Sequence, residues 1–220
     1  MTHVLSRATK NLAGFFSKEQ KLINEFDKFK TDAQKLLNNI LAEPKIENSP
    51  ESLKKPANSS ENFNLDRGVS NYMNELREMI ESQKAKQPDL IQANLKEIQD
   101  IYDKYRKELW YRMDKKAYYR KYNKVDKLQD AVAEINTKGE YTGNYMYPKD
   151  MNKLDNEIRN YISKLEREVS KDNVYKKEEI KADLEEIKKE YNEYLDYLKT
   201  KENYIKEKGI RINIHEPYTV

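Results

Sequence analysis

Cysteine is absent from this sequence, and turn-forming residues are scarce. Without thiols the chain has no disulfide, no thiolate metal site and no cysteine nucleophile. Its five glycines and six prolines are too few for the turns of a many-stranded β protein. It also lacks any stretch near the roughly 20 apolar residues that a membrane-spanning helix needs. These absences leave helices as the expected building blocks.

The motifs of common active sites are missing as well. The sequence has no G-x-x-x-x-G-K, G-x-G-x-x-G or G-x-S-x-G pattern to hold a phosphate or present a serine. Its two histidines, His3 and His215, have no second ligand at zinc spacing. Carboxylates such as Asp183 and Glu186 lie among lysines at helical spacing, as on a solvated helix face. We therefore expect no enzymatic activity, no metal, no cofactor and no small-molecule substrate.

Charged residues are abundant but balanced in sign. They make up 37% of the chain, with 42 basic and 39 acidic side chains and a net charge of +3. Mixed charges argue against a dedicated DNA-binding protein, although a local patch can still bind an anion. The hydrophobic share, also 37%, is small for a compact sphere but sufficient for helices that each hide one stripe. We predict an all-α protein of elongated long helices with coiled-coil-like seams and extended termini.

The hydrophobic pattern divides the chain into five segments. A four-three rhythm that starts at Leu22 indicates a helix, which Pro44 ends. Pro, Ser and Asn residues follow without a visible period, and the rhythm then returns up to Gly209, a suitable helix stop. The predicted segments are an amphipathic leader or docking segment (1–16), a helix (17–42), a linker (43–68), a long-helix bundle or stalk (69–209) and an extended tail (210–220).

The longest predicted helix runs from about Pro88 to Thr137. A proline is tolerated in the first turn of a helix, where its missing amide hydrogen is not needed. One apolar seam reaches Leu109 and another starts at Val125, and this sixteen-residue separation is not a multiple of seven. The apolar face must therefore rotate, or the helix must bend or change its packing partner, near Met113.

Residues 1–18 contain no acidic side chain. Within them, Leu5, Ala8, Leu12 and Phe15 recur at helical spacing, and Ser and Thr fill the gaps. This composition is typical of a mitochondrial transit peptide. A surface-lying amphipathic anchor has the same features, and so does a frayed first helix of chance composition. We expect a mitochondrial protein.

Residues 106–127 form a basic–aromatic segment with nine basic and three acidic side chains. Tyrosines and the single tryptophan are interleaved with the lysines and arginines. Basic groups neutralise phosphates, and rings stack on bases or sit at lipid headgroups, so the segment predicts contact with an acidic protein, RNA or anionic lipid. The alternative is a helix whose rings pack on a neighbour while its lysines face water. The candidate partner-binding residues are Arg106, Trp110, Arg112, Lys116 and Arg120.

The tail changes to a period of two. Ile210, Ile212 and Ile214 alternate with polar residues, so the three isoleucines share one face of an extended segment. Exposed on a free tail, such a row is an aggregation hazard. We predict that this tail docks in extended form on another chain, by strand addition for example. The alternative is that it folds back on its own helices.

Residues 12–47 resemble subunit d of the mitochondrial ATP synthase peripheral stalk. The resemblance rests on an aromatic pair, a helix and a proline turn, carried by Phe15–Phe16, Phe26, Phe29, Leu36, Leu37, Ile40, Leu41, Pro44, Ile46 and Glu47. It implies a matrix-side, non-catalytic stalk component whose partners are other protein subunits. Two other functions fit the composition. One is an RNA-associated mitochondrial ribosomal accessory protein that uses residues 106–127, and the other is a coiled-coil cytoskeletal or viral scaffold.

Overall fold

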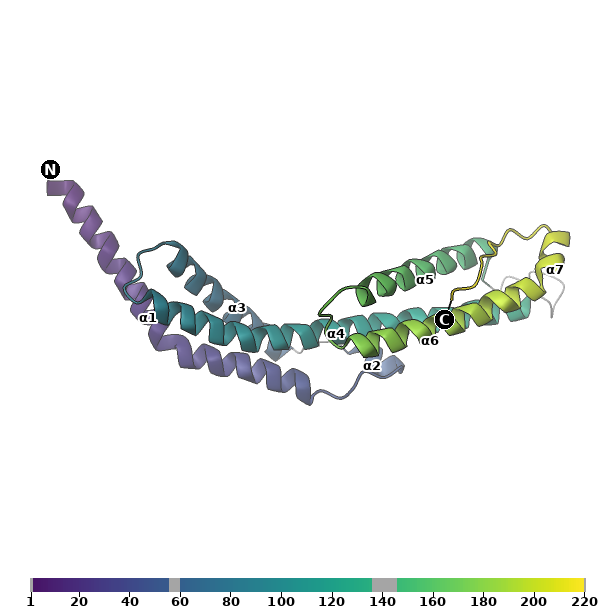
Figure 1. Cartoon of the computed structure of the whole chain (residues 1–220), viewed down its shortest axis with the longest axis horizontal. Helices are drawn as coiled ribbons and strands as arrows, with labels where there is room; N and C mark the ends of the chain where they lie inside the picture. The colour runs from purple at the N-terminus through teal and green to yellow at the C-terminus, as the bar shows by residue number, and fades with distance from the viewer. Residues whose placement is uncertain (1, 56–59, 136–145, 220) are drawn as a thin grey trace. The chain divides into compact units, whose positions relative to one another are not determined.

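A computed structural model describes residues 2–55, 60–135 and 146–219. All regular structure in these residues is helical, which confirms the predicted all-α fold. The helices, labelled in Figure 1, are α1 (Thr2–Ala42), α2 (Pro50–Lys54), α3 (Ser60–Glu81), α4 (Pro88–Glu134), α5 (Pro148–Val169), α6 (Lys177–Thr200) and α7 (Glu202–Glu207).

The helices form two compact units. Unit 1 comprises Met1–Lys45 and Lys54–Met113, and unit 2 comprises Ile46–Leu53 and Asp114–Val220. The boundary lies inside α4 at Met113, and of the alternatives predicted there the structure shows a change of packing partner. The predicted division into a linker and one 69–209 bundle is corrected, because the two halves of α4 belong to different cores.

Unit 1 has a core built from α1, α3 and the first half of α4. The hydroxyl of Tyr72 on α3 donates to the Leu22 carbonyl at 2.6 Å, and its ring stacks on Phe29 of α1 at 4.3 Å. A Cβ at Gly68 would lie 3.7 Å from the Phe29 ring, an ordinary van der Waals distance, so this position has room for a small side chain. The largest fully buried side chains of this core are Leu22, Leu36, Ile40, Leu76, Met79, Ile91, Ile98 and Tyr105.

Polar contacts define the directions of these three helices. Asn39 donates to Asn62 at 2.8 Å, whereas Lys18 pairs with Glu78 at 3.5 Å, so α3 runs antiparallel to α1. The turn between α3 and α4 lies beside Glu19. One carboxylate oxygen of Glu19 accepts the Gln87 amide at 2.8 Å, and the other accepts the Lys86 amide at 3.1 Å. Glu19, which is buried, thereby satisfies free amides at the start of α4.

Two predicted helix boundaries are corrected. α1 begins at Thr2 rather than near residue 17, so the amino-terminal segment is helical and continuous with the rest of α1. Its sequence up to residue 16 contains no proline, and helix propagation needs no new nucleus. α3 begins at Ser60, inside the predicted 43–68 linker, and α2 lies there as well. The buried Asn62 extends the apolar seam of α3 backwards, which a purely hydrophobic rhythm does not reveal.

Unit 2 has a core built from the second half of α4 together with α5, α6 and α7. Ion pairs join Lys124 to Glu157 and Asp114 to Lys164, so α5 runs antiparallel to α4. The buried Lys201 donates to the Val132 carbonyl at 2.9 Å, which places a positive charge at the C-terminal end of α4. The buried hydrophobic residues are Tyr118, Val125, Leu128, Val132, Met151, Ile158, Tyr161, Ile162, Leu165, Leu184, Ile187, Tyr191, Tyr194, Leu195, Leu198 and Ile205.

A short segment between α1 and α3 also belongs to unit 2. Asn48 and Asn123 exchange two side-chain hydrogen bonds of 2.9 Å, and Arg120 donates to the Leu53 carbonyl at 2.9 Å. Residues 46–53 are thus attached to α4 although the chain on both sides of them belongs to unit 1. At the other end of the unit, Gly209 adopts a left-handed φ of 65° after α7, as the predicted helix stop requires.

Candidate functional site

Trp110 is an exposed aromatic residue of the basic–aromatic segment, and the half-buried Arg106 lies one turn before it on α4 in unit 1. The Trp110 side chain is 54% exposed, and the Arg106 guanidinium carbon lies 5.3 Å from the centre of its ring. On its other side, Arg106 lies 3.6 Å from the carboxylate of Asp66 on α3. Asp66 also accepts the Tyr102 hydroxyl at 2.6 Å. The arginine is therefore held between α3 and the indole, and the pair forms a cationic, aromatic patch.

Arg112, predicted to bind a partner, is a buried structural residue. Its Nε donates to Glu108 at 3.0 Å, and its two terminal nitrogens donate to the carbonyls of Glu43 and Pro44 at 3.0 and 2.9 Å. These carbonyls follow the last turn of α1, so Arg112 connects the end of that helix to α4. Unit 1 supplies all of these acceptors, so Arg112 has a structural role within the chain, and its binding to a partner stays a prediction. Glu108 is buried beside it.

Unit 2 uses most of the remaining cations of the segment. Lys116 is buried, whereas Arg120 is exposed and donates a hydrogen bond to the Leu53 carbonyl; the binding of a partner by these two residues stays a prediction. Lys115 forms an ion pair with Asp183 on α6, and Lys121 and Lys124 both pair with one oxygen of Glu157 on α5. The alternative interpretation of the segment therefore holds for this part: its rings and charges join α4 to its neighbours.

Two lysines bind the Glu157 carboxylate, so the stability of unit 2 should depend on pH through this group. Hydrogen bonds from Lys124 and Lys121 lower the pKa of Glu157 to about 2, from an ordinary value of 4.5. Because the folded-state pKa is the lower one, the charged carboxylate favours folding above about pH 4.5, and this contribution is lost as the pH falls toward 2. The side chain is 33% exposed, so solvent screening limits the effect to about 1 kcal/mol.

We expect Glu157→Gln to lower the free energy of unfolding at pH 7 and to flatten its decline between pH 4.5 and pH 2. Urea titrations at several pH values measure both effects. Glu185→Gln, at an exposed position on α6, is the matched control and should leave the wild-type profile in place. A profile for the Glu157 variant that parallels the wild type would contradict the assignment.

The carboxy-terminal tail packs against the core of its own unit. Ile210, Ile212 and Ile214 are partly buried against the unit 2 cluster, while the intervening Arg211 and Asn213 are exposed. The predicted alternation of faces is confirmed, although the described tail residues contain no strand. This packing agrees with the alternative in which the tail folds back on its own helices, and docking of the tail on another chain stays a prediction.

Side-chain amides hold the main chain of the tail in place. Asn152 on α5 donates to the Arg211 carbonyl at 3.0 Å and accepts the Asn213 amide at 2.9 Å. Asn192 on α6 does the same for Tyr218, with distances of 2.8 and 2.7 Å. Each asparagine thus replaces the two hydrogen bonds that a neighbouring strand would supply. An extended segment is accommodated on a helical surface in this way.

A buried carboxylate lies under the middle of the tail. Asp155 on α5 is 1% exposed, and one of its oxygens lies 2.9 Å from Nε2 of His215. Its other oxygen accepts the hydroxyl of Tyr191 on α6. Burial raises the pKa of Tyr191, and the hydrogen bond to Asp155 raises it further, so this tyrosine stays a neutral donor. The three side chains join α5, α6 and the tail.

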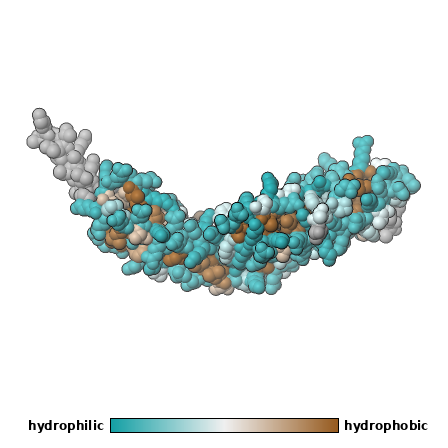
Figure 2. All heavy atoms as spheres, viewed as in Figure 1, coloured by the Kyte–Doolittle hydropathy of each residue, from teal (hydrophilic) through white to brown (hydrophobic). Residues whose placement is uncertain are grey.

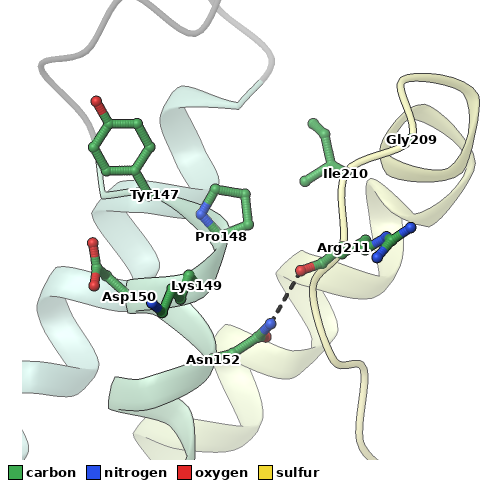
Figure 3. Close-up of a pocket in the computed structure, with 8 residues that line it drawn as sticks. All are labelled: Tyr147, Pro148, Lys149, Asp150, Asn152, Gly209, Ile210 and Arg211. Carbon is green, nitrogen blue, oxygen red and sulfur yellow. Dashed lines mark hydrogen bonds between the residues drawn. The ribbon is translucent and has the colours of Figure 1, made fainter.

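An open groove adjoins the start of the tail (Figure 3). It has a volume of about 930 Å³ and is lined by Tyr147, Pro148, Lys149, Asp150, Asn152, Gly209, Ile210 and Arg211. Figure 3 shows Pro148 and Ile210 facing each other across it, with the hydrogen bond from Asn152 to the Arg211 carbonyl at its lower edge. The Arg211 side chain points away from Pro148, so the charged groups do not converge on a common point.

The described side chains form no cluster of three potential metal ligands. None of the helices, within the residues described, is long and apolar enough to cross a bilayer. Comparison with known proteins added no relative, since no protein-family model, curated protein or solved structure matches this chain.

Proposed function

We propose that this chain is a non-catalytic structural subunit that binds other proteins in a large, membrane-associated mitochondrial complex. The peripheral stalk of an ATP synthase is the best named candidate, on the resemblance of residues 12–47. The observation that carries the structural role is α4, a 47-residue helix that supplies buried side chains to the cores of both units. At about 1.5 Å per residue, the helix itself is about 70 Å long.

The ionisable groups of the interior support a structural rather than a chemical role. Glu19 and Lys201 satisfy free backbone groups at helix ends, and Arg112 binds two carbonyls beyond the end of α1. Asp155 binds two side chains that belong to other segments of unit 2. Catalysis requires polar groups that converge on space for a substrate. Each of these groups is instead bonded to other groups of the same chain.

The patch of Arg106 and Trp110 is the proposed contact for a partner protein. Tryptophan and arginine are the side chains most enriched among residues that dominate binding energy at interfaces. Figure 2 shows that hydrophobic side chains are scattered among mostly hydrophilic ones on the visible surface of the described residues. Against that background, an indole 54% exposed beside a positioned guanidinium is a distinctive feature. The RNA-binding alternative has less support, because Lys115, Lys121 and Lys124 are paired within the chain.

Purification of the tagged chain under native, mild-detergent conditions tests this proposal. We expect co-migrating protein subunits, with at least a tenfold (about 1.4 kcal/mol) weaker association for Trp110→Ala. Leu90→Ala removes another exposed apolar side chain from the same helix and serves as the control. Recovery of ribosomal RNA that resists moderate salt, with Trp110→Ala unchanged, would favour the RNA-associated function instead.

A further inference from the structure

The amino-terminal turns of α1 extend past the end of the bundle in unit 1. α3 ends at Glu81 and α4 begins at Pro88, and the turn between them is bonded to Glu19. The part of α1 before Glu19 contains 17 helical residues, Thr2 to Lys18, and so runs on for about 25 Å. Figure 1 shows these first turns continuing beyond the α3–α4 turn. In unit 1, the helices α3 and α4 therefore end and begin at this level.

The apolar stripe of α1 nevertheless continues through these turns. At about 100° per residue, Val4, Leu5, Leu12, Phe15 and Phe16 fall within an arc of about 120°. The buried Leu22 belongs to the same arc of the helix, so the apolar positions of the packed part of α1 continue in register through the sequence of its first turns. An apolar stripe of this kind requires a cover.

The charges opposite the stripe indicate what that cover is. Beyond Glu19, α1 carries lysines mixed with aspartates and glutamates, as expected for a helix that faces water or another charged helix. In residues 1–18 the opposite arc carries Arg7 and Lys10 with no acidic residue at all. A basic polar face behind a leucine and phenylalanine face is the pattern of a helix that lies in the interface of an anionic bilayer.

We infer that residues 2–18 of α1 bind the surface of an anionic lipid bilayer, with the helix in the plane of the interface. Leucine and phenylalanine side chains enter the acyl boundary, while Arg7 and Lys10 face the headgroups. Unit 1 is then attached to the membrane through a helix continuous with its own core. This inference stands independently of the proposed function, since it needs neither a mitochondrial location nor a particular complex.

Flotation of the purified full-length chain with lipid vesicles tests the inference. Vesicles of phosphatidylcholine with roughly 30 mol% phosphatidylserine should carry the chain upward, and phosphatidylcholine alone should carry much less. The double variant Leu12→Asp/Phe15→Asp should bind at least about tenfold more weakly. Phe63→Asp, which alters an aromatic side chain 61% exposed on α3, should bind like the wild type. Raising the salt to about 0.5 M should reduce binding.

Two results would overturn the inference. One is equal flotation of the wild type and the double variant. The other is a chain that does not float but self-associates in sedimentation velocity, with the double variant monomeric, because the stripe then covers a second copy of the helix. Circular dichroism and a thermal melt of the double variant show whether the substitutions cause a folding defect.

Discussion

Replacing Arg112 by methionine is expected to lower the free energy of unfolding of unit 1 by about 3–5 kcal/mol. The substitution leaves Glu108 charged and buried without its guanidinium, and it removes both donors to the carbonyls of Glu43 and Pro44. Trp110 is the only tryptophan and lies in unit 1, so its fluorescence during urea unfolding reports this transition. The midpoint should shift to a lower urea concentration.

The double variant Glu108→Leu/Arg112→Met distinguishes a lost ion pair from lost packing. Replacing both members of a buried pair by apolar side chains is often nearly neutral, because no uncompensated charge remains. The double variant should therefore recover much of the stability that Arg112→Met loses. If Arg112→Met alone changes the midpoint by less than the error of the titration, the bonds of Arg112 to Glu108, Glu43 and Pro44 do not stabilise unit 1.

Ending the chain after Gly209 is expected to destabilise unit 2 by about 3–5 kcal/mol. The truncation exposes the surface that Ile210, Ile212 and Ile214 cover, and it removes His215 from the buried Asp155. Only unit 2 should lose stability. Far-ultraviolet circular dichroism should show an earlier loss of helix on heating, while the Trp110 fluorescence transition stays in place.

A pair of full-length triple variants provides the control for the truncation. Ile210→Ser/Ile212→Ser/Ile214→Ser should reproduce most of the destabilisation, because it alters only the face of the tail that packs on the core. Arg211→Ser/Asn213→Ser/Glu216→Ser changes exposed positions and should be nearly neutral. A truncated chain as stable as the wild type, yet absent from its complex, would favour the docking of the tail on another chain.

The sequence predicted the helical class and an interruption of the apolar seam near Met113, but it did not reveal that charged residues are buried within the seams. The positions Tyr102, Tyr105, Leu109, Arg112 and Lys116 follow one four-three rhythm. The signal for their burial was therefore present, because the rhythm continues through two cations. Hydrophobic periodicity alone stops at Leu109, since it counts only apolar side chains. Which neighbour accepts a buried charge depends on tertiary packing and is not encoded in local spacing.

Counting only apolar residues also failed to predict the burial of the Asp155 carboxylate beneath the tail. Met151, Asp155, Ile158, Ile162 and Leu165 form a four-three rhythm on α5, and all five are buried. An apolar count selects Leu154 instead, although Leu154 is only partly buried. The sequence pattern also did not predict which residues bind the tail, because Asn152 and Asn192 bond to its main chain and belong to no hydrophobic period. A polar residue at a seam position is thus the signal to seek in similar helical sequences.

The placement of residues 46–53 in unit 2 has a consequence for synthesis on the ribosome. Asn48 emerges 75 residues before Asn123, its hydrogen-bonding partner. At about 5–20 residues per second, translation of that interval takes about 4–15 s. The α1, α3 and early α4 segments of unit 1 are all made within this delay or before it, so unit 1 is able to close first. The 46–53 segment then waits as a loop on a finished bundle, and the nascent unit 2 captures it last.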